Sequence, residues 1–337
     1  MKLVILDGYS FPGDTFPEPI KVAKENGFEF VVGNAHTEEE VIELAHDADG
    51  MLVVYVRIDE PLLRKLPKIK VIVRTGVGFD NFDLAGATRA GVIACNTPDY
   101  GVGEVATSAT AMLLALERKL LPFSNQLRKG NWDDGHGYTM YRLTNRVVGF
   151  VGFGRIARQT AKFLAGFGYR FIAYDPYLPA SVFAEYNTQS ASLDEVLSAS
   201  DALILMAPLT SETHHVIRGE NIAKMKKGVL IVNTARGPLV KIDDLIEALK
   251  SGHVRGAALD VFENEPIKDA SYPLWAMENV IATPHAAYRS EESFVALKTM
   301  ATETLTNLIT GKREPYNVIN PDVLKVPNRL SEFLKKT

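Results

Sequence analysis

Short runs of aliphatic and β-branched residues alternate with segments of helical periodicity along this 337-residue chain, and the alternation limits the possible folds more than any other feature. Strands that alternate with helices are typical of a parallel sheet covered by helices on both faces. One series of runs occupies residues 3–6, 28–32, 51–54, 71–73 and 92–94, and a second occupies residues 147–151, 170–174, 202–205, 229–232, 256–259 and 280–282. The sequence therefore predicts an α/β protein with two doubly wound parallel sheets, one in each of two domains.

The longer helices are indicated by apolar periodicity and by capping residues. Thr37 precedes a run of glutamates, which is typical of the start of a helix, here over residues 37–46. Residues 101–128 are rich in Ala, Leu and Met and predict one long buried helix, and residues 290–310 predict another. Residues 130–145 are polar and aromatic and contain glycines, which favours a loop between the two series.

The composition is that of an ordinary soluble globular protein, with 46% hydrophobic and 23% charged residues. A net charge of −4 and the lack of a long Lys or Arg run disfavour nucleic acid and an anionic membrane as partners. The first apolar run is too short for a signal peptide or a membrane span. Because Cys95 is the only cysteine, no internal disulfide can form, and we expect a cytoplasmic protein.

A glycine-rich turn follows the first run of the second series. Gly152 permits a tight turn, Gly154 lets the backbone approach a pyrophosphate, and the small Ala157 lets the next helix pack closely on the strand. The helix start at Arg155 and Ile156 would direct amide groups and a partial positive charge at the phosphates. Such a turn alone is weak support, because glycine turns also occur as plain strand-to-helix connections.

A carboxylate strengthens the nucleotide interpretation of this turn. Asp175 ends the next predicted strand, about 20 residues further on, where it would accept hydrogen bonds from the ribose hydroxyls of NAD. The same carboxylate would repel the 2′-phosphate of NADP. The sequence therefore predicts NAD as the cofactor, and the alternative is an unliganded turn with a surface aspartate.

Three further polar residues follow later predicted strands, at the edge where open α/β sheets bind ligands. Taken singly, Arg236, Glu265 and His285 are explained as a surface cation, a solvated acid and a loop histidine. Together they suit hydride transfer to a 2-oxo acid. A guanidinium binds the substrate carboxylate or carbonyl oxygen, an imidazole exchanges a proton with the alkoxide, and a carboxylate orients the imidazole. The nicotinamide supplies the hydride.

The chain resembles the D-isomer-specific 2-hydroxyacid dehydrogenases over nearly its whole length. The matching segments are Arg74-Thr75-Gly76-Val77-Gly78-Phe79-Asp80-Asn81, Asn96-Thr97-Pro98, the glycine turn with Asp175, Asn233-Thr234-Ala235-Arg236-Gly237, Ala258-Leu259-Asp260-Val261-Phe262-Glu263-Asn264-Glu265-Pro266 and Thr283-Pro284-His285-Ala286-Ala287. Within the family, residues 175–178, 255–260 and 284–287 look most like the branch that contains the C-terminal-binding protein corepressors, which holds both enzymes and regulators.

The resemblance implies roles for single residues. Arg236 would bind the substrate, Glu265 would be the carboxylate partner and His285 the acid/base, and the backbone amides of Val77 and Gly78 would hold the substrate carboxylate. The implied NAD contacts follow the strands of the second series and comprise Gly152, Gly154, Arg155, Ile156, Asp175, Pro208, Thr213, Thr234, Ala235, Arg236, Asp260 and His285.

Two of the implied ligand contacts have alternatives. For Thr213 the alternative is a helix N-cap. Tyr288 either covers the substrate pocket and limits substrate size or is a packing aromatic. A phosphate-bearing substrate would need extra basic residues, for which Arg57 and Arg74 are candidates.

The resemblance also implies the arrangement of the domains. A Rossmann-like NAD-binding domain of residues 101–289 would be inserted into a discontinuous, flavodoxin-like substrate domain of residues 1–100 and 290–337. Members of the family are usually homodimers. Departures from the family pattern are mild, since Ala157 replaces a third glycine and Asn145, which tolerates positive φ, stands where a turn glycine is common.

Adjacent His214 and His215 suggest a metal pair only superficially. Neighbouring side chains point apart on a strand and are poorly placed on a helix, so we expect no metal site.

The sequence thus predicts an NAD-dependent enzyme that transfers a hydride between NAD(H) and C2 of a small 2-hydroxy or 2-oxo acid, with D-specificity implied by the resemblance. The rival from another class is an NAD-sensing regulator that keeps the fold and binds a protein partner, and a third hypothesis is a non-catalytic oligomerisation module. The complete set of Arg236, Glu265 and His285 favours the enzyme, while the substrate and the direction of the reaction stay open.

Overall fold

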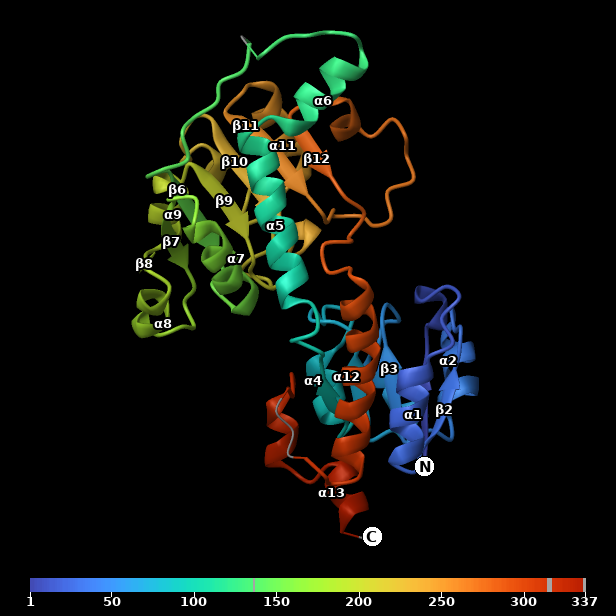
Figure 1. Cartoon of the computed structure of the whole chain (residues 1–337). Helices are drawn as coiled ribbons and strands as arrows, with labels where there is room; N and C mark the ends of the chain where they lie inside the picture. Colours follow the sequence, from blue (N-terminus) through green and yellow to red (C-terminus); the bar gives the residue numbers. More distant parts are fainter. Residues whose placement is uncertain (136, 314–316, 336–337) are drawn as a thin grey trace. The chain divides into compact units, whose positions relative to one another are not determined.

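The computed structural model describes residues 1–135, 137–313 and 317–335 (Figure 1). The chain divides into two compact units, one of residues 1–101 and 290–337 and one of residues 102–289. Each unit is built on one sheet in which all the strand pairings are parallel. The prediction of two parallel sheets flanked by helices is therefore confirmed.

The first unit has a five-stranded sheet in the order β2-β1-β3-β4-β5. Its strands are β1 (Lys2–Ile5), β2 (Glu29–Val32), β3 (Gly50–Val53), β4 (Val71–Arg74) and β5 (Ile93–Cys95). The helices that pack on one face are α1 (Pro17–Glu25), α12 (Glu291–Ile309) and α13 (Arg329–Leu334), and those on the other face are α2 (Glu38–Ala45), α3 (Glu60–Lys65) and α4 (Leu84–Arg89). The expected helix after Thr37 is confirmed, since Thr37 forms a capping box with Glu40.

The second unit has a seven-stranded sheet in the order β12-β11-β10-β9-β6-β7-β8. Its strands are β6 (Val147–Val151), β7 (Arg170–Tyr174), β8 (Thr188–Ser190), β9 (Ala202–Leu205), β10 (Val229–Asn233), β11 (Val254–Leu259) and β12 (Val280–Ala282). The edge strand β8 was not expected from the sequence, because it is short, polar and exposed at two of its three residues.

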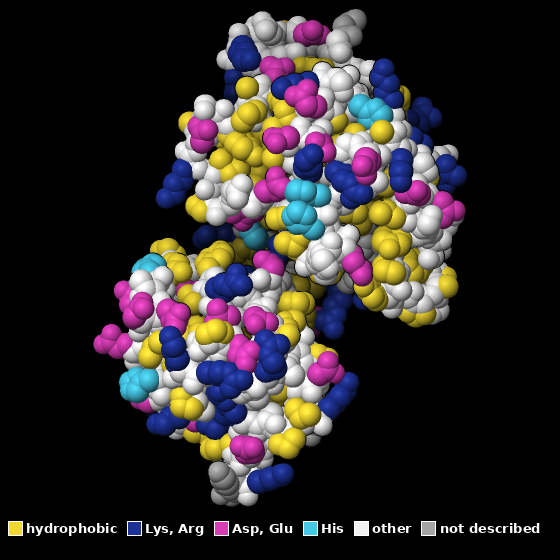
Figure 2. Space-filling model, turned by 180° about the vertical axis from the view of Figure 1, so that it is seen from behind, with side chains coloured by type: hydrophobic (Ala, Val, Ile, Leu, Met, Phe, Trp, Pro, Cys, Tyr) yellow, Lys and Arg dark blue, Asp and Glu magenta, His cyan; other side chains and the backbone are white. Residues whose placement is uncertain are grey.

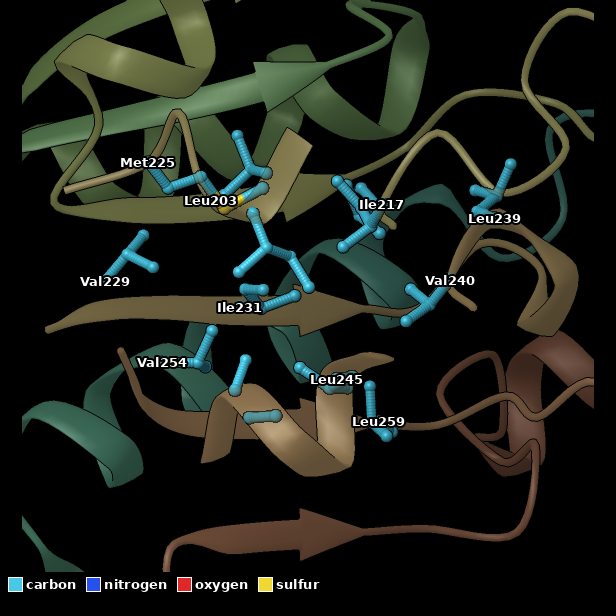
Figure 3. Close-up of a cluster of buried hydrophobic side chains, with 14 of the residues drawn as sticks. Leu203, Ile217, Met225, Val229, Ile231, Leu239, Val240, Leu245, Val254 and Leu259 are labelled. Carbon is cyan, nitrogen blue, oxygen red and sulfur yellow. The ribbon is translucent and has the colours of Figure 1, made fainter. Parts of the chain in front are cut away.

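Helices cover both faces of this larger sheet (Figure 1). One face packs against α5 (Val102–Glu117), α7 (Arg155–Ala165) and α8 (Ala180–Glu185), and the other packs against α9 (Leu193–Ala199), α10 (Gly219–Ile222) and α11 (Ile242–Lys250). Successive residues of β10 contribute to opposite faces, as the strand period of two requires. Figure 3 shows part of the apolar cluster on the face that α9, α10 and α11 cover, with Ile231 of β10 and Leu245 of α11 among the side chains drawn.

The single helix expected over residues 101–128 is wrong, because the chain forms two helices there. Helix α5 ends at Glu117, and α6 (Leu120–Arg128) begins after Lys119, which has a left-handed φ of 54°. In a continuous helix, Pro122 would have no amide hydrogen to donate to the carbonyl group of Arg118, and its ring would clash with that group. Proline is tolerated in the first turn of a helix, which is where Pro122 lies in α6. The buried carboxylate of Glu117 pairs at the break with Arg146 (3.2 Å) and Arg255 (2.8 Å).

Because the strands of the second unit are parallel, the segments that follow them emerge at one edge of the sheet. The strand order reverses between β6 and β9, and open α/β sheets bind ligands at such a switch point. The glycine turn follows β6, Asp175 follows β7, and Arg236 and His285 follow β10 and β12. The fold therefore gathers the predicted cofactor residues at one edge.

The described part of the chain contains no helix that is long and apolar enough to cross a membrane. On the face drawn in Figure 2, acidic and basic side chains are mixed, and hydrophobic side chains lie in several separate groups.

A buried carboxylate organises the corresponding edge of the first unit. Asp7, which follows β1, is fully buried, and its two oxygens accept hydrogen bonds from the amides of Val54 (2.9 Å), Tyr55 (2.5 Å) and Val56 (3.1 Å) after β3. A buried charge is tolerated only when such donors surround it.

We predict that Asp7→Ala lowers the free energy of unfolding of the first unit by about 3 kcal/mol, because it leaves amide groups without acceptors. Hydrogen exchange of peptides from β1 and β3 would measure this for the first unit alone. Asp47→Ala is the matched control, because Asp47 pairs with Lys2 on the surface. If the peptides of β1 and β3 were equally protected from hydrogen exchange in Asp7→Ala and Asp47→Ala, the anchoring role of Asp7 would be contradicted.

Candidate functional site

The turn after β6 has the backbone that the glycine pattern predicts. Gly152 has a φ of 86°, which side-chain-bearing residues rarely adopt. A Cβ atom added at Gly152 would lie 2.6 Å from the amide nitrogen of Ala207, so the turn passes directly against the segment after β9. Glycine is therefore required at this position by conformation and by space.

Gly154 meets a different requirement. It is the N-cap of α7, and a Cβ atom added there would meet nothing within 4 Å, so the protein's own packing does not demand glycine. Arg155 and Ile156 form the first turn of α7, whose amide groups are not used within the helix and suit an anion. Ala157 is fully buried where α7 packs on the sheet. The turn thus fits a dinucleotide pyrophosphate.

Asp175 lies directly after β7, beside the glycine turn. One oxygen of its carboxylate accepts a hydrogen bond from the amide of Phe153 (2.9 Å), and the other accepts one from the amide of Tyr177 (3.1 Å). An ionised carboxylate can accept about four hydrogen bonds, so capacity remains for ribose hydroxyls. The residues present therefore fit NAD.

The structure excludes the alternative that the sequence left open for Thr213 in the segment after β9. Thr213 lies in a turn at residues 211–215, and its hydroxyl donates to the carbonyl oxygen of Pro208 (2.6 Å) and accepts from the amide of Thr210 (2.8 Å). No helix starts at Thr213, so the N-cap alternative is wrong. The hydrogen bond instead ties Thr213 to Pro208, the other residue predicted to contact NAD in this segment.

Arg236 is held by a turn that Asn233 organises. The Asn233 side chain accepts from the amide of Ala235 (3.0 Å) and donates to the carbonyl oxygen of Arg236 (2.9 Å). Thr234 is buried within this turn. Asn233 has no predicted role in chemistry, and its place at the start of the Asn233–Gly237 motif is the signal that marks it in the sequence.

Asp260 positions the segment that carries His285. Its carboxylate is buried and accepts hydrogen bonds from the Thr283 hydroxyl and from the amides of Ala286 and Ala287 (both 2.9 Å). The carbonyl oxygen of Asp260 accepts from the amide of His285 (2.7 Å), which has a left-handed φ of 52°. A contact of Asp260 with the cofactor stays a prediction, since the structure shows Asp260 as the anchor of residues 283–287.

Glu265 and His285 form the pair that the sequence predicts. Nδ1 of His285 lies 2.6 Å from one carboxylate oxygen of Glu265, and the other oxygen accepts from the amide of Phe262 (2.7 Å). Burial raises the pKa of Glu265, but these hydrogen bonds and the charges of His285 and Arg236 outweigh it and hold that pKa below its usual value. Glu265 is therefore a carboxylate at neutral pH.

Gly237 joins the Arg236 turn to the segment that carries Glu265. A Cβ atom added at Gly237 would lie 1.9 Å from the carbonyl carbon and oxygen of Phe262. Only glycine allows the two segments to approach so closely. Arg236, Glu265 and His285 are thus brought together by loops after β10, β11 and β12.

Val77 and Gly78 belong to the first unit, in the turn after β4. The side chain of Asn96 donates to the carbonyl oxygen of Val77 (2.7 Å), and the amide of Thr97 donates to that of Gly76 (2.9 Å). Two of the sequence segments that carry the family resemblance therefore stabilise each other. Asn145 in the second unit has a φ of 69°, which confirms the expected positive φ.

The expectation that the side chains of His214 and His215 point apart is wrong. Their rings are in contact, with centroids 3.9 Å apart and planes tilted by 33°, and His215 lies in a turn with a left-handed φ of 52°, where the rule for strands does not apply. Within residues 1–135, 137–313 and 317–335, no group of three or more His, Cys, Asp or Glu side chains is placed to hold a metal ion. Sequence reasoning missed the partner of His215, which is Glu263.

The chain is similar to known proteins in sequence and in fold. A model of the D-isomer specific 2-hydroxyacid dehydrogenase, NAD binding domain, matches residues 110–287. The chain is 35% identical over 295 residues to glyoxylate reductase of Thermofilum pendens, a match that covers 86% of both chains. It is 37% identical over 321 residues to D-3-phosphoglycerate dehydrogenase of Methanocaldococcus jannaschii, and that match covers 95% of this chain but 59% of the longer relative.

Among solved structures, the D-lactate dehydrogenase of Aquifex aeolicus, complexed with NAD and lactic acid, superposes with a TM-score of 0.83. It is 29% identical, and the match covers 95% of this chain and 99% of that one. Since sequence and fold agree across both units, the chain belongs to the family of D-isomer-specific 2-hydroxyacid dehydrogenases and is an NAD-dependent dehydrogenase.

Proposed function

We propose that this protein interconverts a small 2-oxo acid and its D-2-hydroxy acid with His285 as the acid/base. The observation that carries the proposal is the hydrogen bond of 2.6 Å between Nδ1 of His285 and Glu265. Because an ionised carboxylate only accepts, Nδ1 carries the hydrogen of this bond. Nε2 is then the atom that can exchange a proton with the substrate oxygen.

In the reductive direction, Nε2 of protonated His285 donates its proton to the substrate oxygen as the carbonyl becomes a hydroxyl. Bound NADH supplies the hydride. The carboxylate of Glu265 keeps the imidazole in one orientation before the transfer. In the oxidative direction, neutral Nε2 accepts the hydroxyl proton.

Arg236 is the proposed ligand of the substrate, through its carboxylate or its carbonyl oxygen. A guanidinium offers two parallel donors and a fixed positive charge that polarises a carbonyl. We also propose the amides of Val77 and Gly78 as carboxylate donors, and their turn is held by Asn96. Tyr288 is proposed to limit the size of the substrate.

The substrate class is proposed from chemistry and from relatives. Similar proteins bear the names glyoxylate reductase, hydroxypyruvate reductase and D-3-phosphoglycerate dehydrogenase. We propose a short 2-oxo acid, and the test is NADH oxidation with glyoxylate, hydroxypyruvate, pyruvate, branched and aromatic analogues and a phosphorylated 2-oxo acid. Tight NADH binding without turnover of any of them would instead favour an NAD-sensing regulator.

We predict that His285→Ala lowers kcat by about 10² to 10⁴-fold, because the proton donor is lost, while the Kd for NADH stays nearly unchanged. Steady-state kinetics and quenching of protein fluorescence by NADH would measure the two effects. His253→Ala is the control, since His253 precedes β11 at the opposite edge of the same sheet. Equal losses of turnover and NADH binding in His285→Ala would indicate a folding defect.

We propose that Asp175 selects NAD over NADP. Asp175→Asn keeps a hydrogen-bonding side chain but removes the charge, so we expect NADPH to bind about ten- to a hundredfold more tightly than to the original protein. Titration of both reduced cofactors would measure this, with Asp194→Asn on α9 as the control. An unchanged ratio of the two Kd values would show that other groups select the cofactor.

We further propose a cytoplasmic homodimer. The cytoplasm is proposed because the sole cysteine, Cys95, is buried in β5 and cannot form an internal disulfide. The dimer is proposed because apolar side chains on and after α6 are exposed, with Leu120 at 58%, Leu127 at 53% and Trp132 at 92%. Burial of such side chains is a common basis of association.

We predict a sedimenting species of twice the chain mass of 37.1 kDa. Analytical ultracentrifugation should show a shift toward the monomer for the double variant Leu120→Glu and Leu127→Glu, because charges oppose burial. A single monomeric species for the original protein would refute the dimer.

A further inference from the structure

A second pair of imidazole and carboxylate lies beside the first. Nε2 of His215 forms a short hydrogen bond with Oε1 of Glu263, two residues before Glu265. Both side chains of this pair are about a quarter exposed, at 27% and 24%. One short loop after β11 thus supplies a carboxylate to His215 and another to His285.

The backbone of His215 is fixed to the segment that follows Arg236. The amide of His215 donates to the carbonyl oxygen of Pro238 (2.8 Å), and the amide of Ile217 donates to that of Leu239 (2.9 Å). The guanidinium of Arg218 donates to the carbonyl oxygen of His215 (3.4 Å). The left-handed backbone of His215 therefore has several fixed partners, which is how such a conformation is maintained.

His215 consequently connects the same two segments that meet at Gly237. Its backbone is bonded to Pro238, directly after Gly237, and its ring is bonded to Glu263, directly after Phe262. Gly237 and Phe262 are in close van der Waals contact, whereas His215 forms hydrogen bonds, which are directional. Without His215, the segment from Phe262 to Glu265 would lose its directional bond to the loop after β9.

We propose that His215, through Glu263, is a positioning residue that fixes the loop carrying Glu265 and thereby the imidazole of His285. The inference rests on the proposed role of His285. Glu265 is bonded on one side to Phe262 of its own loop, so a shift of the loop moves the carboxylate that orients His285. A partly exposed ion pair contributes little to the free energy of folding, so a contribution to stability does not by itself account for the pair of His215 and Glu263.

The first test compares His215→Asn and Glu263→Gln with the control His214→Asn. Asparagine tolerates the left-handed conformation, so the backbone at residue 215 can persist while the contact with Glu263 is lost. His214 is the matched control because its ring contacts His215 but is not bonded to Glu263. We expect both test variants to lower kcat about ten- to a hundredfold, with unchanged thermal midpoints and NADH Kd values. Full activity in both would overturn the proposal.

A second test separates positioning from a general structural effect. If His215 acts through Glu265, adding His215→Asn to Glu265→Ala should cause no further loss of kcat. Independent, additive losses would show that His215 does not act through Glu265 and would contradict the proposal.

A third readout does not depend on turnover. In protein labelled with 15N-histidine, the Nδ1 proton of His285 should give a signal that disappears in His285→Gln. We expect this signal to shift or broaden in His215→Asn and Glu263→Gln and to stay in place in His214→Asn. An unchanged signal in both test variants would overturn the inference, whereas a moved signal in a protein without turnover would contradict the proposed function and leave the positioning role supported.

Discussion

The parallel pairing of the seven strands is the constraint on which the rest of the second unit depends. Parallel strands share their direction, so the loops that follow β6, β7, β9, β10, β11 and β12 all emerge along one edge of the sheet. Reversal of strand order between β6 and β9 leaves room there, because neighbouring loops turn to opposite faces. The glycine turn and Asp175 lie near this reversal, while Arg236, Glu265 and His285 follow the strands beyond it.

Buried aspartates hold the loops at these edges. Asp7 binds amides after the neighbouring strand in the first unit, and Asp260 binds residues after the neighbouring strand in the second. A carboxylate suits this task because it accepts several bonds and strengthens them by its charge. Both side chains are almost wholly inaccessible to solvent, so their bonds do not compete with water.

The sequence was sufficient for the order of the buried strands along the chain, because period and residue type indicate them, but it missed the short polar strand β8. The pairing of Glu265 with His285 was implied by the family resemblance. It was insufficient where long-range packing decides the outcome. The helix break at Lys119 is accompanied by buried pairs of Glu117 with Arg146 and Arg255, partners that are far from Glu117 in the sequence. The contact between the rings of His214 and His215 occurs in a turn where His215 has a left-handed φ that no local pattern of residues indicated.

The groups proposed to react and the groups that hold them differ in exposure, and this difference fits the proposed roles. His285 and Glu265 keep 37% and 32% of their side chains exposed, and a group that exchanges protons with a substrate must be reachable. Asp260 and Asn233 are buried, because an anchor holds its geometry best where water cannot replace its partners. His215 and Glu263 lie between these extremes, and bonds from His215 to two loops, rather than burial, restrict their motion.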